Sequence, residues 1–416
     1  MKKGIRDTIL SLLSIVLVFF FLMLLGNRLG IGSSTDIYFL SVMVIAYLNQ
    51  LVQSVWDAMQ PYYIELKIEN PQKSHQLYST LINMIALFSI AIISLYFLTL
   101  EYITLLSIEQ KEFLNIYIFI VFFQNILIFN KKILNLEHHY ASYYLVDIFI
   151  YSLNIVALLW FYNGNLQLIA YTMIVATAVA TVWQFYLIFK KTSIFYSFQL
   201  YHPKSIEIVK NSIKMKISGM LYDLKEPLFA LIFLTLGEGL FSLYNYAYKF
   251  SAAIFQVTNT PSINRYLTNI NHVVAQKKYQ EIEPLIQKIL FETLPFFIIS
   301  SATFYFVMPL FLELTFGDKL DGSSIQTLQI LFIYISFFYL VIVLETPYSN
   351  NIGVFKLFNY HIFVNMIFSV FMLSIYFIFK HFSLEYMVYL NILIVAQLSN
   401  FILFFYKNLF YIRRKR

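Results

Sequence analysis

Long apolar runs recur along this chain and are separated by short polar segments. A helix needs about 20 apolar residues to cross the hydrocarbon core of a bilayer. Twelve runs are long enough, and we expect spanning helices at 9–25, 37–64, 77–99, 113–130, 140–162, 166–189, 215–236, 239–261, 286–316, 325–345, 355–379 and 384–406. Several runs exceed the minimum, so tilted or extended helices are expected. The pattern predicts an all-α integral membrane protein with twelve transmembrane helices.

Composition agrees with this fold class. The chain is 60% hydrophobic and only 12% charged, whereas about 25% of residues are charged in a soluble domain. It contains no cysteine, which excludes disulfides and thiolate metal sites. The first apolar run is longer than the core of a signal peptide, and no small-residue cleavage site follows it. We therefore expect a retained first helix.

The distribution of lysine and arginine predicts the orientation. With the N-terminus in the cytoplasm, 23 of the 29 basic residues fall in cytoplasmic segments and four fall outside. This bias favours cytoplasmic N- and C-termini. The same bias accounts for the net charge of +7, because the basic residues gather in the cytoplasmic segments. We therefore infer no nucleic-acid partner.

The chain divides into halves of six spans. We expect an N-terminal lobe at 1–191, a cytoplasmic linker at 192–214, and a C-terminal lobe with a basic tail at 215–416. Matching residues recur between the halves at offsets of 207, 206, 200 and 211: Leu29-Gly30 with Leu236-Gly237, Tyr38 with Tyr244, Pro61 with Pro261, and Asn154 with Asn365. Two such repeats would place a binding cavity between the lobes. Chance matching in an apolar sequence remains the alternative.

Charges interrupt the seventh apolar run. Asp223, Lys225 and Glu226 lie near its middle, followed by Pro227. A charge at the centre of a bilayer costs roughly 3 kcal/mol or more without a polar lining or a partner. Because proline has no N–H, the carbonyl of Asp223 loses its helical donor. Either a proline kink carries a self-paired cluster that joins helices, or a broken helix lines a central polar pathway.

Two runs carry polar stripes. In each, the polar side chains fall within an arc of about 80° on a helix. The second run carries Asn49, Gln53, Asp57 and Gln60, and the eighth carries Asn245, Lys249, Gln256 and Asn259. Interhelical hydrogen bonding would account for the amides. Lys225 and Lys249 near the membrane centre favour a cavity that receives an anion.

Other chemistry is limited. The sequence has no phosphate-binding loop, no HExxH motif and no Ser/His/Asp constellation, so we expect neither an ATPase engine nor a resident cofactor or metal. Na⁺ or H⁺ is a candidate coupling ion. Asp223 and Glu226 are one turn apart on one helix face, and with the freed carbonyl they provide hard oxygen donors of the kind small cations prefer. Alternatively, Lys225 neutralises one of these acids.

Short motifs resemble those of a known transporter superfamily. The stretch from Gly30 through Asp36 and Tyr38 to Leu40, a Gly-rich turn followed by an acid and aromatic residues, enters the second span. Tyr244 to Phe250 is the similar segment of the second half, and Phe316-Gly317-Asp318 follows the ninth span. The chain resembles the multidrug/oligosaccharidyl-lipid/polysaccharide (MOP) exporter superfamily, and within it the O-antigen and capsule repeat-unit flippases. Peptidoglycan-precursor flippases usually carry two further spans.

The resemblance implies a substrate and a location. The substrate would be an undecaprenyl-diphosphate-linked oligosaccharide, turned from the inner to the outer leaflet of the bacterial inner membrane by alternating access. It implies a cationic cavity between lobes, matched by Lys225 and Lys249, and a cation site at a seventh-span acid to which Asn359 or Asn365 would add an amide oxygen. Membrane lipids, the polysaccharide polymerase and its chain-length machinery are the implied partners. Relatives often carry Arg deep in spans 1 and 2, whereas here Arg28 lies at the outer mouth.

Two other functions remain open. A multidrug or cation antiporter of the same fold would favour a net acidic cavity, and the two lysines argue against it. An O-antigen polymerase or ligase would have a similar number of spans. Those enzymes need a large external loop with catalytic Arg or His, and every predicted external loop here is short. We therefore expect a transporter rather than an enzyme.

Overall fold

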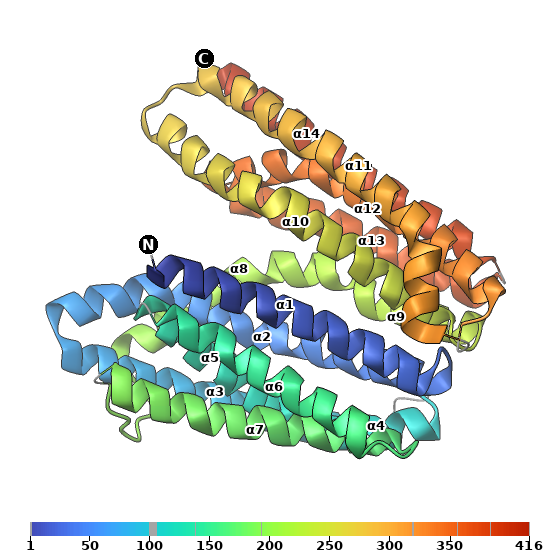
Figure 1. The fold of residues 1–416 in the computed structure, drawn as a ribbon. Helices are drawn as coiled ribbons and strands as arrows, with labels where there is room; N and C mark the ends of the chain where they lie inside the picture. The colour runs from blue at the N-terminus through green and yellow to red at the C-terminus, as the bar shows by residue number, and fades with distance from the viewer. Residues whose placement is uncertain are drawn as a thin grey trace. The chain divides into compact units, whose positions relative to one another are not determined.

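The chain is all-helical in the part that the structure describes (Figure 1). The computed structural model describes residues 2–99, 106–137, 139–192, 194–317, 320–355, 357–382 and 384–415. Its helices are α1 (Lys2–Leu29), α2 (Ser33–Glu69), α3 (Pro71–Thr99), α4 (Ile108–Tyr117), α5 (Ile120–Leu136), α6 (Tyr140–Trp160), α7 (Leu166–Lys191), α8 (Pro203–Asp223), α9 (Lys225–Leu236), α10 (Leu240–Ala275), the 3₁₀ helix η2 (Tyr279–Glu281), α11 (Ile282–Phe316), α12 (Gly322–Val354), α13 (Phe358–His381) and α14 (Tyr386–Lys415).

Each predicted apolar run falls mainly on helix in the described residues, which confirms the all-α membrane fold class. Among the described residues, seven helices are long and apolar enough to cross a membrane, and the bent pair α4 and α5 would make an eighth. The count of twelve spans stays a prediction.

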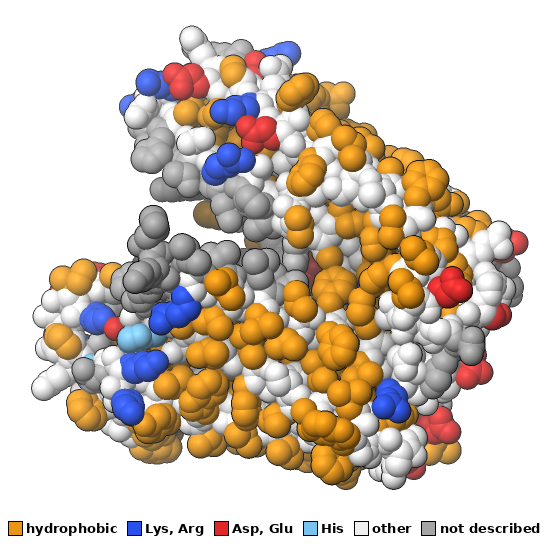
Figure 2. All heavy atoms as spheres, viewed as in Figure 1, with side chains coloured by type: hydrophobic (Ala, Val, Ile, Leu, Met, Phe, Trp, Pro, Cys, Tyr) orange, Lys and Arg blue, Asp and Glu red, His pale blue; other side chains and the backbone are white. Residues whose placement is uncertain are grey.

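The chain folds as two compact units. The N-terminal unit comprises Met1–Gly30 and Ile37–Lys216, and the C-terminal unit comprises Ile31–Asp36 and Ile217–Arg416. On the visible face of each unit hydrophobic side chains predominate, and most Lys and Arg side chains lie near one end (Figure 2). An apolar outer face with charges near the ends suits helices that are surrounded by lipid.

In the N-terminal unit, α1 packs against α6, and α7 packs against α5 and α6. Leu127, Val146, Ala176 and Ala180 form a small buried cluster where these helices meet. Lys131 on α5 lies 2.7 Å from the Asp147 carboxylate on α6. The small alanines let the helices approach closely, and the ion pair keeps both charges away from lipid.

In the C-terminal unit, α12 is the central helix and packs against α10, α11 and α14. A buried cluster at one end joins Ile270, Ile286, Phe355 and Ile412 from four segments. Beside it the hydroxyl of Tyr266 donates to Asn351 Oδ1 at 2.7 Å. These contacts extend the packed core along the part of α10 that follows its apolar run.

Several predicted boundaries were wrong. The fourth run is not one helix: it begins at Ile108 and bends by 41° between α4 and α5, where the N–H of Phe119 bonds the carbonyl of Ile116 instead of that of residue 115. Such an i→i−3 bond tightens the helix and ends regular α geometry.

Residues 203–214 of the predicted linker are helical, since α8 begins at Pro203, and the assignment of 192–214 as a cytoplasmic linker stays a prediction. His202 precedes it, and its Nδ1 accepts the N–H of Lys204. Proline suits the first helical position, where an N–H would have no partner. Likewise α10 continues to Ala275 and α12 to Val354, since polar residues beyond an apolar run do not by themselves stop a helix.

Candidate functional site

The helix break expected near Pro227 is present. α8 ends at Asp223 and α9 begins at Lys225, with Leu224 between them. Leu224 still donates its N–H to Met220 O at 3.0 Å, whereas the bond from Leu228 N to Leu224 O is 3.4 Å long. Pro227 supplies no N–H for the Asp223 carbonyl. The broken helix is thus confirmed, and the pathway it was expected to line stays a prediction.

Lys225 is buried at this break. Its Nζ lies 3.5 Å from Asp223 Oδ1 and 3.7 Å from the centroid of the Tyr222 ring. A carboxylate and a ring face both stabilise an ammonium group that has left water. In this structure, therefore, Lys225 and Asp223 are self-paired, as one of the two sequence interpretations proposed.

A polar chain continues from Tyr222 to a buried acid. The Tyr222 hydroxyl donates to Gln397 Oε1 at 2.9 Å, and Gln397 Nε2 donates to Glu345 Oε2 at 2.6 Å. Glu345 on α12 and Gln397 on α14 are both buried. An amide has one acceptor end and one donor end, so Gln397 links the hydroxyl to the carboxylate in a single orientation.

Glu226 is the third acid of the cluster. Its Oε1 accepts the hydroxyl of Tyr248, on α10, at 3.4 Å. The Tyr248 ring lies 5.5 Å from that of Tyr339 on α12. Asp223, Glu226 and Glu345 therefore outnumber the single lysine of this cluster. We call the group of seven residues around the helix break the break cluster: Tyr222, Asp223, Lys225, Glu226, Tyr248, Glu345 and Gln397.

Chemically, the break cluster suits exchange of a proton or a small cation. It combines carboxylate, amide and hydroxyl oxygens, which hard cations prefer. A buried carboxylate without a full counter-charge is costly, and taking up a proton or cation relieves that cost. Within the described residues, no group of three or more His, Asp or Glu side chains is arranged to hold a metal ion.

Comparison with known proteins identifies the fold. No protein-family model and no curated protein sequence matches the chain. Solved structures do match. The lipid II flippase MurJ, in an inward closed conformation, superposes with a TM-score of 0.76 at 16% identity, covering 97% of this chain and 87% of that one. The chain has the fold of the MOP-superfamily transporters.

Two further structures show the same MOP fold. An inward-facing multidrug resistance MATE transporter of the MOP superfamily gives a TM-score of 0.70 at 15% identity, over 95% of this chain and 94% of that one. A MOP superfamily transporter from Pyrococcus furiosus gives 0.65 at 14% identity, over 99% and 95%. At such identities the likeness is one of fold, and both flippases and drug transporters share it.

Within this MOP fold, the N-terminal unit holds four of the predicted substrate-binding residues. Asn49 is buried, and its Nδ2 donates to Gln124 Oε1 at 2.9 Å. Arg28 is exposed, and its Nη2 lies 3.4 Å from Leu159 O. The side chains of Gln53 and Asp57 fall outside the described residues. For Asn49, an interhelical hydrogen bond is therefore the observed role.

The predicted stripe on α10 is mixed in its surroundings. Asn245 is buried and turns its amide nitrogen to the carbonyl of Phe241 on its own helix, at 3.0 Å. Lys249 is half-buried and Gln256 is exposed. Asn259 is buried, and its Nδ2 has no hydrogen-bond partner among the residues that the structure describes. The four polar residues therefore do not share one environment, although they share a helix face.

The two asparagines of α13 have roles other than the expected amide ligand. Asn365 Nδ2 donates to the carbonyl and hydroxyl oxygens of Ser218, both at 3.0 Å, which ties α13 to α8. Asn359 is exposed at the start of α13 and lines a shallow pocket with Tyr360 and Lys407. The amide nitrogen of Asn365 therefore joins two helices, and Asn359 lies at the surface.

The motif residues Asp36 and Tyr38 are structural. Asp36 is buried and accepts hydrogen bonds from Gly239 N at 2.9 Å and Ser242 N at 2.7 Å, at the start of α10. A carboxylate is favoured at a helix N-terminus. Tyr38 is buried, and its ring lies 6.3 Å from that of Phe21.

Sequence reasoning missed Glu345, Gln397 and Tyr222. Glu345 closed an apolar run and was read as the end of a span, although α12 continues through Pro347. Gln397 lies in the middle of the last apolar run, between Asn391 and Asn400. A polar side chain within a span is costly unless it has a partner. Glu345 and Gln397 therefore indicated contacts with other polar groups, such as the charged residues at 223–226.

Proposed function

We propose that this protein is a flippase that moves an undecaprenyl-diphosphate-linked oligosaccharide from the inner to the outer leaflet by alternating access. The observation that carries the proposal is the likeness of 97% of the chain to a lipid II flippase, at a TM-score of 0.76. The name of that protein, a lipid II flippase, indicates that its cargo is lipid-linked. We place this chain in the bacterial inner membrane with both termini in the cytoplasm.

In this proposal Lys249 attracts the diphosphate. It lies half-buried on α10, and an intramembrane ammonium group favours an anionic ligand. Lys225 is paired with Asp223 in the present conformation, so it would meet the diphosphate only if that pair opened during the cycle. Amide and tyrosine side chains would meet the sugar hydroxyls.

We assign coupling to the break cluster. One elementary charge crossing 100 mV releases about 2.3 kcal/mol, and an inward-moving Na⁺ or H⁺ would bias the cycle. Asp223 and Glu226 provide carboxylates at the helix break, and Glu345 adds a buried one on α12. Proton or cation binding would change the hydrogen bonds that Gln397 holds between α8 and α12.

The test is translocation in proteoliposomes that contain the lipid-linked oligosaccharide, under imposed Na⁺ or pH gradients. Wild type should respond to one gradient, and Glu345→Gln, Asp223→Asn and Glu226→Gln should lose that response. Glu385→Gln, at an exposed acid before α14, is the matched control and should respond normally. A gradient response retained by all three cluster variants would exclude coupling there, and no translocation of the lipid would exclude the flippase.

A second candidate is a multidrug or cation antiporter. It is favoured by the excess of three carboxyl groups over one lysine in the break cluster. The same proteoliposomes, loaded with a cationic dye and without lipid cargo, separate the two functions. Dye movement coupled to the gradient, without lipid translocation, would favour the antiporter.

A further inference from the structure

The segment between α7 and α8 carries an unusual set of exposed rings. Phe195, Phe198 and Tyr201 expose 74%, 75% and 65% of their surface, and Leu200 exposes 51%. Contiguous exposed apolar side chains mark a binding or membrane-contacting surface. Aromatic side chains in particular gather at the level of lipid headgroups.

This aromatic segment is held against α3. Asn83 Nδ2 donates to Gln199 O at 2.8 Å, and the Tyr196 hydroxyl donates to Asn83 Oδ1 at 2.7 Å. The N–H of Ser197 donates to Ser79 Oγ at 3.0 Å. Ser79 and Asn83 lie in the first turns of the apolar run of α3. The segment is therefore fastened where the predicted span 77–99 begins, and its exposed rings suit contact with lipid headgroups.

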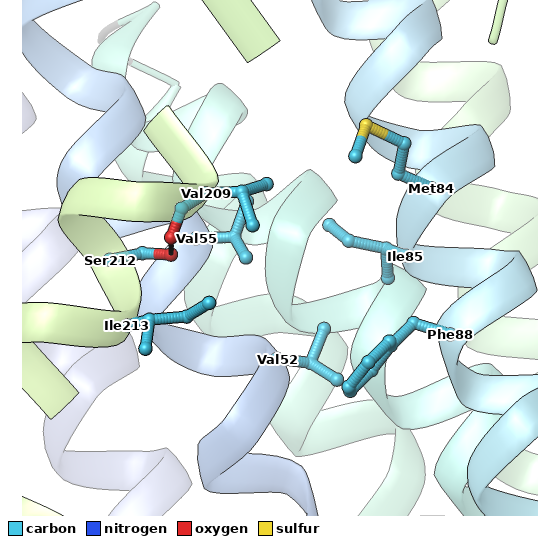
Figure 3. A pocket seen from close by; sticks show the side chains of 8 residues that line it. All are labelled: Val52, Val55, Met84, Ile85, Phe88, Val209, Ser212 and Ile213. Atoms are coloured by element: carbon cyan, nitrogen blue, oxygen red, sulfur yellow. Dashed lines mark hydrogen bonds between the residues drawn. The ribbon is translucent and has the colours of Figure 1, made fainter. Parts of the chain in front are cut away.

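Directly beyond these anchors lies an apolar groove in the same unit. Met84, Ile85 and Phe88 on α3 face Val52 and Val55 on α2 and the side chains of Val209 and Ile213 on α8 (Figure 3). Its cavity volume is about 110 Å³, which admits a short segment of a hydrocarbon chain and is smaller than a site for a whole drug-sized ligand.

Among the described residues, a single polar side chain lines the groove. Ser212, its one polar lining residue, donates its hydroxyl to Val209 O at 2.7 Å. Val52 and Ile85 form a buried floor, whereas Phe88 and Ile213 expose 49% and 53% at the rim. A groove that is apolar throughout and open at its rim suits a hydrocarbon chain.

Two lysines and one acid lie at the end of the groove nearest the anchors, where Lys204 Nζ is 3.5 Å from Glu207 Oε2. Lys73 and Lys204 both act electrostatically on His202 at the start of α8. Lys204 lies one to two helical turns before Val209, a rise of about 8 Å. An anionic headgroup near these lysines would thus place the first carbons of its chain at the groove.

We propose that this groove between α2, α3 and α8 seats the first isoprenyl segment of the transported lipid's tail, with its diphosphate first held near Lys73 and Lys204. The inference rests on the proposed flippase function, and it adds a docking site for the tail. A polyprenyl diphosphate brings one hydrocarbon chain to the groove, whereas a phospholipid brings two.

The test is photocrosslinking in proteoliposomes with labelled undecaprenyl diphosphate as the probe. Benzoylphenylalanine replaces Phe88 at the rim, and replaces Leu95, which is 61% exposed on the same helix but does not line the groove, in the control. Capture at position 88 should exceed capture at position 95 about tenfold, equivalent to about 1.4 kcal/mol, and should persist with excess phosphatidylglycerol. Equal capture at both positions, or replacement of the probe by phosphatidylglycerol, would overturn the proposal.

Filling the groove gives a second readout. Met84→Trp should lower capture at position 88 about tenfold, whereas Leu87→Trp, on an exposed side of the same turn, should not. Unchanged capture in Met84→Trp would also overturn the docking site. Translocation of the lipid without capture at position 88 would contradict the tail-docking site and leave the proposed flippase function standing. Capture without translocation of the glycosylated lipid would retain the groove and remove the proposed function.

Discussion

Asp36 and Ser242 are 206 residues apart and joined by two hydrogen bonds: Asp36 Oδ1 accepts both the N–H and the hydroxyl of Ser242. The contact is matched by a second one, in which Glu238 accepts the N–H of Ser33 at 3.1 Å. Asp36 thus caps α10, and Glu238, just before α10, caps α2. Each carboxylate serves a helix N-terminus of the other half, where negative charge is favoured.

The helix boundaries at these junctions repeat with one offset. α1 ends at Leu29 and α9 at Leu236, and α2 begins at Ser33 and α10 at Leu240. Both pairs differ by 207 positions, the offset that the Leu-Gly pairs predicted. The crossed caps explain why an acid follows the Gly-rich turn: it is required by the other junction, not by its own helix.

Removing the Asp36 charge should destabilise the C-terminal unit. Asp36→Asn keeps the size of the side chain but turns an amide N–H toward donors. Hydrogen bonds to charged groups contribute about 1.5–3 kcal/mol, so we expect a loss of about 2 kcal/mol in unfolding free energy. Thermal unfolding in detergent measures it. Ser34→Ala, at an exposed neighbour, is the control, and equal melting temperatures for all three proteins would contradict the capping role.

The success and failure of prediction from sequence have physical causes. Helices were predictable because lipid demands long uninterrupted apolar runs, and the break at Leu224 because Pro227 removes a specific donor. Glu345 and Gln397 were missed because the partner of each lies on another helix. A one-dimensional pattern shows the cost of such a residue but not the group that offsets it.

Gln397 should matter for stability as well as coupling. Replacing it with Leu removes the donor to Glu345 and the acceptor of Tyr222. A buried polar group left unsatisfied costs about 1–3 kcal/mol. We expect Gln397→Leu to lower the unfolding free energy by that amount and Gln397→Leu with Glu345→Leu to recover part of it. Asn391→Ala, exposed on the same helix, should be neutral. Additive losses in the double variant would show that the pair is not coupled.

The start of α8 should be sensitive to acid. Burial and the nearby charges of Lys73 and Lys204 lower the pKa of His202 from its ordinary value of 6.5. The folded state therefore favours the neutral ring, whose Nδ1 accepts the Lys204 N–H. This contribution is complete above pH 6.5 and is lost as pH falls through the lowered pKa. The protection of the peptide 203–208 against hydrogen exchange, measured relative to the intrinsic rate at each pH, should fall in acid, and His202→Asn should remove this pH dependence.

Orientation can be measured because the chain has no cysteine. Single cysteines at Asn163 and Ser323, both exposed between helices or at a helix start, should react with an impermeant maleimide from outside. A cysteine at Lys278, exposed before η2, should react only after permeabilisation. These sites avoid Asn165 and Asp321, whose side chains cap α7 and α12. Labelling at Lys278 in intact cells would reverse the predicted topology.

The two intramembrane lysines should differ in what their loss does. Lys225→Gln leaves Asp223 without its partner at 3.5 Å. Breaking a buried pair costs about 3–5 kcal/mol, and because the Asp223 side chain is 26% exposed we expect about 2 kcal/mol. The double variant Lys225→Gln with Asp223→Asn should recover most of that stability, as a double-mutant cycle in detergent would measure.

Lys249→Gln, by contrast, should abolish export at near-normal protein levels, and Lys249→Arg should retain part of it. Full export by Lys249→Gln would remove its role toward the diphosphate, and a cycle without coupling energy would show that Lys225 and Asp223 stabilise the fold independently.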